Sequence, residues 1–572
     1  MPTLQFKGKN IIWNHHLSIP YHTLDEVEKL HYNPDKSNGN IIIEGDNLLA
    51  LKALLPQFHG QIKCIYIDPP YNTGNEHWIY NDNVNSPLLN NWLGKEVGSD
   101  DMTKHDKWLC MMVPRLKLLR ELLSDDGAIF ISIDENEQSS LRIIMDEIFG
   151  SECFVSCLTV VNNLKGRNDK KNIATCNEYL LIYQRKNWES YGIPLTEEQL
   201  KIYKYEDDKG NKYALRDLRK RGRPDRREDR RNMWFPIYYN PKTKECSLFK
   251  KSDFVEITPK RGDGSDGRWR WGRDRVEKYL SWLHPRYSKS KNRWDIDHRV
   301  YLDLNLDSDI SDEESDDDDF TYLRTSKSKS FWMESSISSD IALRELKELF
   351  KIPPFDYPKA VSYIKKIIQM SCSENEIVLD SFGGSGTTMH AVMDLNKEDG
   401  KNRQCILIQM TEATELEPKK NICKDITRER IKRAIDKYEY ESGIKYFQIG
   451  TPIDAESLLS GKLPTFRQFA EYVYYLCTGE HIKDKSVINE KMFLVGEHNN
   501  SVIYLIYKQD FEKLTKLALN LTISEKIISD NPKKKIIVYA PACFLEEDYM
   551  KEKNIEFVGI PYNLFHRENG VD

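Results

Sequence analysis

Short, unbroken apolar runs bounded by turn-forming residues are the clearest pattern along this chain. Ile65–Ile67 is one such run, and two consecutive prolines end it directly after Asp68. Ile377–Leu379 is a second, followed by a glycine-rich turn and a segment that predicts a helix opening near Thr387 or Thr388. Both runs have the length and composition of buried parallel strands, so the pattern predicts an α/β architecture.

The tetrapeptide Asp68-Pro69-Pro70-Tyr71 follows the first run. It would place the Asp68 carboxylate, the Pro69 carbonyl and the Tyr71 ring at the carboxyl end of one strand. Two acceptors beside an aromatic face can grip a planar amine that is a poor nucleophile, such as the exocyclic nitrogen of a base. The alternative is a plain strand-ending turn with a surface tyrosine, because proline-rich turns are common.

The glycine-rich segment 376–396 predicts close approach of the backbone to a ligand, since Gly383, Gly384 and Gly386 carry no Cβ. The two threonines that follow can cap a helix and offer hydroxyl groups to a carboxylate. The segment is not a dinucleotide fingerprint, because Met389 stands at the third glycine position, and no Lys-Ser/Thr pair marks a phosphate loop. Taken alone, it is equally consistent with a simple strand–helix connection.

Together, these two motifs resemble the amino-methyltransferases of DNA, which combine [D/N/S]-P-P-[Y/F/W] with F-x-G-x-G. Here the second motif is Phe382–Gly386, and it follows the first, as in the permuted β class of that family. The segments R-D-L-R (216–219), G-R-W-R-W-G (267–272) and R-E-L-K-E-L-F (344–350) are similar to modification subunits of type III restriction–modification systems and their stand-alone relatives. The resemblance covers about residues 40–440.

The resemblance implies a doubly wound, Rossmann-like sheet in permuted order, with an inserted target-recognition region and a small C-terminal α+β domain. The expected organisation is an N-terminal arm (1–39), a catalytic half (40–189), the insertion (190–345, with an acidic loop at 311–319), a cofactor-binding half (346–440) and a C-terminal domain (441–572). Residues 375–412 would supply the first two strands, and residues 40–135 the next three. Ligands of such sheets bind where the winding direction switches.

The resemblance also implies roles for individual residues, with S-adenosylmethionine as the cofactor and no metal. Asp68, Pro69, Pro70 and Tyr71 would be catalytic. The cofactor would contact Asp46, Tyr357, Pro358, Lys359, Asp380, Phe382, Gly384, Gly386, Thr387, Thr388 and Gln409. Alternatives remain for three of them. Lys359 could be a solvated lysine and Asp46 a turn-forming acid, while Gln409 stands where many relatives carry an acid, with Glu412 three residues on.

Local charge changes the picture that the net charge of −6 suggests for a DNA-binding protein. Two basic stretches, at 216–231 and 260–275, lie within the expected insertion, and the second interleaves arginines with Trp269 and Trp271. Either could be a solvated face, but in this position they would neutralise phosphates and read bases. The candidate DNA-binding residues are Arg216, Arg219, Arg226, Arg227, Arg230, Arg231, Arg268 and Arg270. The acidic run Asp312–Asp319 would repel DNA and is interpreted as a disordered loop.

The remaining composition is that of an ordinary soluble protein, with 39% hydrophobic residues. No run approaches the ~18 apolar residues of a membrane span, the N-terminus has no signal-peptide core, and the 11 cysteines form no C-x-x-C pair. We therefore expect an intracellular, cytoplasmic protein with reduced thiols.

The resemblance further implies double-stranded DNA as substrate, a homodimer, and a separate helicase–nuclease subunit if restriction occurs. Asp rather than Ser at position 68 favours adenine N6 as the acceptor. Cytosine N4 is the alternative within the same chemistry, and a catalytically silent specificity subunit is the alternative outside it.

Overall fold

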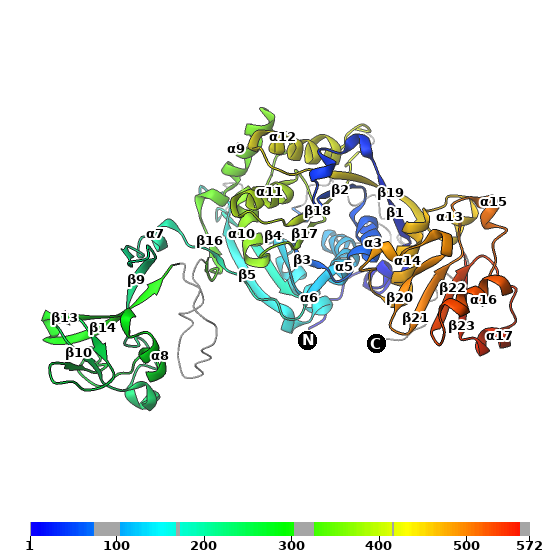
Figure 1. Ribbon diagram of the computed structural model, residues 1–572. Helices are drawn as coiled ribbons and strands as arrows, with labels where there is room; N and C mark the ends of the chain where they lie inside the picture. The colour runs from blue at the N-terminus through cyan, green and yellow to red at the C-terminus, as the bar shows by residue number, and fades with distance from the viewer. Residues whose placement is uncertain (1, 74–102, 167–171, 303–324, 414–416, 561–572) are drawn as a thin grey trace. The chain divides into compact units, whose positions relative to one another are not determined.

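The computed structural model describes residues 2–73, 103–166, 172–302, 325–413 and 417–560. The chain divides into two compact units (Figure 1). The larger comprises Met1–Tyr191 and Lys329–Asp572, and the smaller comprises Gly192–Ser328. The smaller unit is thus an insertion between two halves of the larger one.

A mixed sheet of ten strands, counted over the described residues, organises the larger unit, in the order β1-β19-β2-β18-β17-β3-β4-β6-β5-β16. The six strands from β19 to β4 are all parallel, whereas β6 runs antiparallel to both of its neighbours. The strands are β1 Tyr21–Glu26, β2 Ile41–Glu44, β3 Ile62–Ile67, β4 Leu123–Ile133, β5 Phe154–Val161, β6 Asn177–Gln184, β16 Phe331–Trp332, β17 Ile377–Asp380, β18 Gln404–Gln409 and β19 Lys445–Ile453.

The strand order confirms the predicted permuted, doubly wound fold. On one side of β17 the next strands in the sheet are β18 and then β2, although β2 comes far earlier in the sequence. On the other side, the chain winds from β3 to β4. The direction switches between β17 and β3, where Leu379 pairs with Ile65. Ligands of open α/β sheets bind outside the strand ends at such a point.

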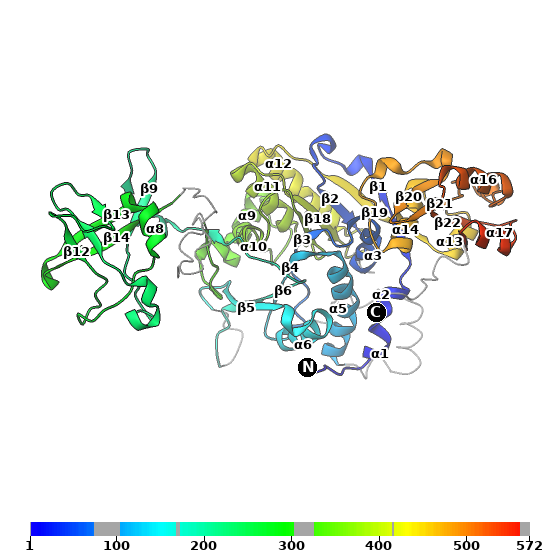
Figure 2. The same cartoon turned by 60° about the horizontal axis from the view of Figure 1, so that its bottom comes forward.

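Helices cover both faces of this sheet, which explains why its central strands are mainly apolar (Figure 2). On one face, Ile65 and Ile67 belong to the same core as helices α3 and α5. On the other face, the Tyr66 hydroxyl lies 3.0 Å from Ser132 Oγ, which lies 3.1 Å from the Tyr363 hydroxyl of α10. The helices are α3 Asn47–Phe58, α5 Lys104–Leu122, α6 Gln138–Phe149, α9 Ser339–Phe350, α10 Val361–Ser371, α11 Thr387–Asp399 and α12 Glu429–Tyr438.

The C-terminal part contains a second, four-stranded sheet in the order β20-β21-β22-β23. Helix α14 contacts both β20 and α3, and its Phe469 and Tyr472 share the core that contains Ile65. The range predicted for this domain starts at 441, whereas β19 within it still belongs to the main sheet. The elements are α13 Ala455–Leu459, α14 Phe466–Thr478, β20 Leu494–His498, β21 Ser501–Leu505, α15 Phe511–Leu514, α16 Leu521–Asp530, β22 Lys535–Ala540, α17 Glu547–Glu552 and β23 Ile555–Gly559.

The smaller unit is built from short antiparallel strands around an aromatic core that includes Phe235, Trp269 and Trp271. The expected insertion ends at 345, whereas this unit ends at Ser328 and β16 and α9 belong to the larger unit. The predicted acidic run at 312–319 lies outside the described residues. The elements are β7 Ile193–Pro194, β8 Tyr205–Glu206, β9 Lys212–Asp217, β10 Ile237–Tyr239, β11 Cys246–Ser247, β12 Val255–Ile257, α8 Arg273–Lys278, β13 Leu283–Ser288, β14 Arg293–Tyr301 and β15 Thr325–Ser326.

Trp269→Ala should destabilise the smaller unit by about 3–5 kcal/mol, because it empties the centre of a small core. Trp269 is 1% exposed, and its indole N–H donates to the Phe235 carbonyl at 2.7 Å. Urea unfolding, with protease cleavage mapped to 192–328, measures the effect. Phe249→Ala, at a residue 67% exposed in the same unit, should stay within about 0.5 kcal/mol of the parent. Equal stability of the two variants would contradict this account of the core.

Candidate active site and nucleic-acid interface

The Asp68–Tyr71 motif leaves the end of β3 beside the switch point. The Tyr71 hydroxyl donates to Asp68 Oδ1 at 2.8 Å, so the motif folds back on itself. The Pro70 carbonyl accepts the indole N–H of Trp108 at 2.7 Å, and Trp108 is fully buried in α5. The turn is therefore anchored by the helix that follows it in the described chain. Trp108 lies within the range that the family resemblance covers, but the sequence predicted no role for it.

A buried charge cluster surrounds this motif. Lys359 Nζ lies 3.2 Å from Asp68 Oδ1, 2.7 Å from the Tyr71 hydroxyl and 2.9 Å from Glu178 Oε2. The side chain of Lys359 is 17% exposed, so the alternative of a solvated lysine is wrong. Its predicted place at the cofactor stays a prediction, since the carboxylates it contacts here belong to the chain itself.

Glu178 is the residue that sequence analysis missed at this site. Its carboxylate is 4% exposed and comes from β6, the antiparallel strand beyond β4. A signal was present in the sequence, because an acid stands one residue into an otherwise apolar strand, N-E-Y-L-L-I-Y. Buried charges in such strands are rare unless they are paired.

The cluster shifts the protonation equilibria of its members. Enclosure by the protein raises the pKa of Asp68, Lys359 opposes this rise and Glu178 adds to it. Enclosure would lower the pKa of Lys359, but the two carboxylates outweigh it and that pKa is raised. Burial, with Asp68 and Glu178 nearby, raises the pKa of Tyr71 far above its usual value. Lysine and tyrosine therefore both keep their protons at neutral pH.

The glycine-rich turn lies on the other side of the switch point, after β17. Gly384 and Gly386 adopt φ values of +50° and +85°, which favour glycine. A Cβ on Gly386 would lie 3.1 Å from the Thr427 carbonyl oxygen, and one on Gly384 would lie 3.4 Å from the Phe355 ring. Backbone conformation and crowding thus both require glycine at 386, while the φ value is the stronger constraint at 384.

Asp380 organises this turn from within. It accepts the Phe382 N–H at 2.9 Å and the Thr388 hydroxyl at 2.6 Å, which ties the end of β17 to the first turn of α11. Burial raises the pKa of Asp380 to about 7, against the lowering effect of these two hydrogen bonds. The residue holds the turn in shape, and direct contact with the cofactor stays a prediction for Asp380 and Phe382.

A second buried anchor was not predicted. Arg430 of α12 is fully buried and donates to Ser385 Oγ and to Thr387 Oγ1, each at 2.7 Å. The Thr387 and Thr388 hydroxyls are therefore both engaged within the protein, by Arg430 and Asp380 respectively. The contact of these threonines with the cofactor stays a prediction, and their observed role is to fix the start of α11.

Four other predicted cofactor residues are placed as follows. Gln409 accepts the Gly384 N–H at 2.7 Å and donates to Glu412 at 2.9 Å, so its amide supports the turn. Asp46 caps α3 by accepting the Leu48 N–H at 2.7 Å, as the turn-forming alternative supposed. Tyr357 is 80% exposed. Their roles toward a cofactor stay predictions, as does that of Pro358, which is buried.

The pairing of β17 with β3 brings the two predicted motifs together. The Asn47 side-chain amide donates to the Ser381 carbonyl at 2.9 Å, which joins the start of α3 to the turn after β17. The chemistry of the surrounding groups fits an amino-acid nucleoside such as S-adenosylmethionine. The N-terminus of α11 favours a carboxylate. The partly buried Glu412 carboxylate beside Gln409 can accept hydrogen bonds from hydroxyl groups.

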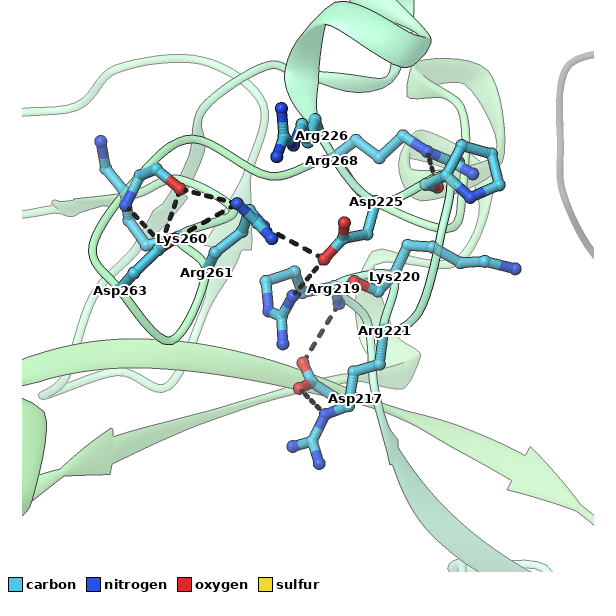
Figure 3. A network of polar contacts seen from close by, with 12 residues as sticks. Asp217, Arg219, Lys220, Arg221, Asp225, Arg226, Lys260, Arg261, Asp263 and Arg268 are labelled. Carbon is cyan, nitrogen blue, oxygen red and sulfur yellow. Dashed lines mark hydrogen bonds and ion pairs between the residues drawn. The ribbon is translucent and has the colours of Figure 1, made fainter.

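The predicted DNA-binding arginines lie in the smaller unit. Most of them are on two loops that carboxylates hold together (Figure 3), whereas Arg216 lies near the end of β9 and Arg270 follows the second loop. Asp225 contacts Arg261 at 3.1 Å and Arg219 at 3.9 Å. Asp266 contacts Lys260 at 2.5 Å and Arg227 at 3.1 Å. We call residues 216–231 and 258–268 the basic loop pair. The exposed members among the predicted residues are Arg216, Arg226, Arg227, Arg230 and Arg231, and Arg219 is partly buried.

Two of the predicted DNA contacts are contradicted. Arg268 is 0% and Arg270 is 8% exposed. Their Nε atoms donate to the carbonyls of Pro224, at 2.9 Å, and Asp217, at 3.2 Å. Each arginine alternates with a core tryptophan but turns its head group to the backbone of the basic loop pair. The two residues therefore brace the loops from inside and are not available to phosphates.

Two further findings concern the described part of the chain. None of its helices combines the length and apolar character that a membrane crossing requires. Nor do any three of its His, Cys, Asp or Glu side chains gather as ligands for a metal ion.

Comparison with known proteins agrees with this geometry. The DNA methylase family model for N6 and N4 methyltransferases matches residues 62–436. The chain is 34% identical over 387 residues to type II methyltransferase M.KpnI of Klebsiella pneumoniae, covering 68% of this chain and 84% of that protein.

Two modification subunits are also similar. The EcoP15I Mod subunit of Escherichia coli is 30% identical over 468 residues, which cover 76% of this chain and 69% of the subunit. The EcoPI Mod subunit of Escherichia phage P1 is 30% identical over 416 residues, which cover 69% of this chain and 61% of the subunit. The motif geometry, the permuted sheet and these matches agree that the chain belongs to the N6/N4 family of DNA methyltransferases.

Proposed function

We propose that this protein methylates adenine N6 in double-stranded DNA, on a base rotated out of the helix. The observation that carries the proposal is the placement of Asp68 and Tyr71 at the switch point, beside the glycine-rich turn. An aspartate at position 68, where cytosine-N4 enzymes commonly carry a serine, supports adenine. The alternative of a silent specificity subunit is not favoured, because both motifs are intact and adjacent.

The chain's residues would act mainly by gripping the base. Asp68 and the Pro69 carbonyl accept the two N–H groups of the amine and draw its nitrogen toward tetrahedral geometry, which frees the lone pair. Tyr71 stacks on the ring. Rotating a base out of the duplex costs a few kcal/mol, and stacking on an aromatic ring, at about 1–3 kcal/mol, offsets much of this cost.

S-Adenosylmethionine, when bound, supplies an electrophilic methyl sulfonium, so the amine nitrogen gains the methyl group, the sulfur leaves as a thioether and the nitrogen then loses a proton. Gly384 and Gly386 would allow the backbone to approach this cofactor, and the N-terminus of α11 would favour its carboxylate. Glu412 would take the ribose hydroxyls, since Gln409 is engaged with Gly384.

The basic loop pair would bind the phosphates of the duplex. Arg226, Arg230 and Arg231 are exposed there, while Arg227 also stacks its guanidinium 3.7 Å from the Trp234 ring centre. Phosphate contacts fix position and base contacts specify sequence. The smaller unit would therefore determine which DNA site is modified.

Partners are proposed from the relatives. Two of them are named as Mod subunits of type III restriction–modification enzymes, and the match spans 61% and 69% of their lengths. A separate restriction subunit would provide any helicase and nuclease activity, and the chain would act as a homodimer. Light scattering of the purified chain, alone and with a co-expressed restriction subunit, tests both.

DNA incubated with the protein and labelled S-adenosylmethionine should yield N6-methyladenine on nucleoside analysis. Labelled N4-methylcytosine would overturn the adenine proposal. DNA that gains no label would favour a catalytically silent specificity subunit. Asp68→Ala should reduce transfer by about a hundredfold or more, because the amine loses its main acceptor. Its affinity for S-adenosylhomocysteine should stay within a few-fold of the parent. A variant that keeps more than about a tenth of the rate would remove Asp68 from this role.

Gly386→Val should weaken binding of S-adenosylhomocysteine at least about tenfold, or about 1.4 kcal/mol, because a Cβ there would lie 3.1 Å from the Thr427 carbonyl oxygen and displace the turn. Calorimetric titration measures it. Gly400→Val is the matched control, because Gly400 also has a positive φ, +71°, but a Cβ there meets nothing within 4 Å. If both variants bind with equal affinity, crowding at the turn does not govern cofactor binding.

Replacing Arg226, Arg227, Arg230 and Arg231 with alanine should weaken binding to all DNA sequences and flatten the salt dependence, by about one unit of slope for each phosphate that the variant no longer binds. The control replaces four exposed lysines of the same unit, Lys242, Lys244, Lys250 and Lys251, and removes the same charge. Fluorescence anisotropy across a salt series distinguishes the two variants. Equal slopes would mean that net charge alone, and not the basic loop pair, determines affinity.

A further inference from the structure

The hydroxyl group of Tyr71 lies within hydrogen-bonding distance of two carboxylates. The Tyr71 hydroxyl lies 2.8 Å from Asp68 Oδ1 and 3.1 Å from Glu178 Oε2. A protonated tyrosine donates a single O–H and can bond only one of the two at a time. Tyr71 keeps this proton, since burial and the two acids raise its pKa. The geometry therefore allows two alternative arrangements of one hydrogen bond.

Lys359 spans the same two acids. Its ammonium lies 3.2 Å from Asp68 Oδ1 and 2.9 Å from Glu178 Oε2. The tyrosine and the lysine thus converge on one oxygen of Asp68, the group that must accept the target amine. While both donors occupy that oxygen, an incoming N–H that binds the same oxygen competes with them.

The two carboxylates differ in their surroundings. The Asp68 side chain is 26% exposed, whereas that of Glu178 is 4% exposed. Glu178 Oε2 also accepts the side-chain N–H of Asn162 at 2.8 Å, which holds it in place. Glu178 is therefore a buried acceptor that Asn162 holds in place, and Asp68 is the more exposed acceptor of the two.

We propose that Glu178 is a positioning residue that takes the Tyr71 hydroxyl and the Lys359 ammonium when Asp68 accepts the target amine. Glu178 itself does not touch the base. The inference rests on the proposed function, because it assigns Asp68 to the amine. The Lys359 ammonium lies between the two carboxylates of Asp68 and Glu178, so the ionised cluster has a net negative charge. Such a charge favours the N–H donors of the target amine.

Glu178→Gln tests the proposal, because it keeps the size of the side chain but removes the charge. Both donors should then stay on Asp68. The single-turnover rate of methyl transfer on saturating DNA should fall by about a hundredfold, the effect expected when a reacting group is misplaced. Affinities for DNA and for S-adenosylhomocysteine should stay within about twofold, since neither ligand contacts Glu178.

The pH profile supplies a readout that a loss of packing would not move. Transfer needs ionised Asp68, so the rate falls as the pH drops through its pKa. Glu178 raises that pKa and Lys359 lowers it. The acid limb should therefore move to lower pH in Glu178→Gln and to higher pH in Lys359→Met. The other titratable groups that influence Asp68 or are influenced by it are Tyr66, Tyr71, Tyr363 and Asp380, which all remain in both variants.

Two further variants make the test decisive. Glu178→Asp keeps the charge, so it should keep the acid limb of the parent and methylate faster than Glu178→Gln. This variant still tests the proposal if Glu178→Gln fails to fold. Asp146→Asn is the matched control. The Asp146 carboxylate also accepts a tyrosine hydroxyl, that of Tyr183 in β6 at 2.6 Å, but it lies away from the motif. The Asp146→Asn variant should therefore methylate like the parent.

Parental rate and pH profile in Glu178→Gln, with a parent that methylates adenine, would overturn the inference and leave the proposed function standing. If Glu178→Asp is as slow as Glu178→Gln, the charge is not the relevant property, and the inference also fails. A parent that yields no N6-methyladenine would instead overturn the proposed function.

Discussion

The parallel pairing of β17 with β3 is the interaction on which the active site depends. It joins the two halves of the larger unit at the point where the winding direction switches, with Leu379 beside Ile65. Each strand ends in one of the two motifs, so the ladder between them places the glycine-rich turn next to the Asp68 turn. The side chains that hold these turns act on an arrangement that the backbone hydrogen bonds of the sheet have already established. Trp108, Asp380 and Arg430 each come from, or bind, a neighbouring helix, and together they stiffen the turns from behind.

Residues whose identity is imposed by the backbone or by the reaction were predictable from the sequence. Gly386 must tolerate a φ of +85°, and Asp68 follows a strand that two prolines end, so local sequence marks both positions. The fold was predictable for the same reason, because fully apolar runs and glycine turns carry the signal of a parallel sheet. Glu178 and Arg430 were not predictable in this way. Their roles depend on partners that are more than forty residues away in sequence, such as Ser385 for Arg430 and Tyr71 for Glu178.

The basic segments show the opposite failure, in which a correct local feature led to a wrong assignment. Alternating Arg and Trp at 268–271 suggested a surface for nucleic acid. The alternation instead places Trp269 and Trp271 in the core, while Arg268 and Arg270 satisfy backbone carbonyls of the loops beside it. Composition cannot distinguish a guanidinium that binds phosphate from one that binds a carbonyl, because both use the same N–H donors. Only burial separates them.

The permuted order of the sheet has a consequence for synthesis of the chain on the ribosome. Strand β3 acquires β4 soon after it emerges, but its other edge must wait for β17, which lies roughly 300 residues later. At about 5–20 residues per second, that edge stays unpaired for about 15–60 s. An open, apolar strand edge is a template for wrong pairing. During this interval the smaller unit, which has a hydrophobic core of its own, is made in full, while the methyl-transfer site does not yet exist.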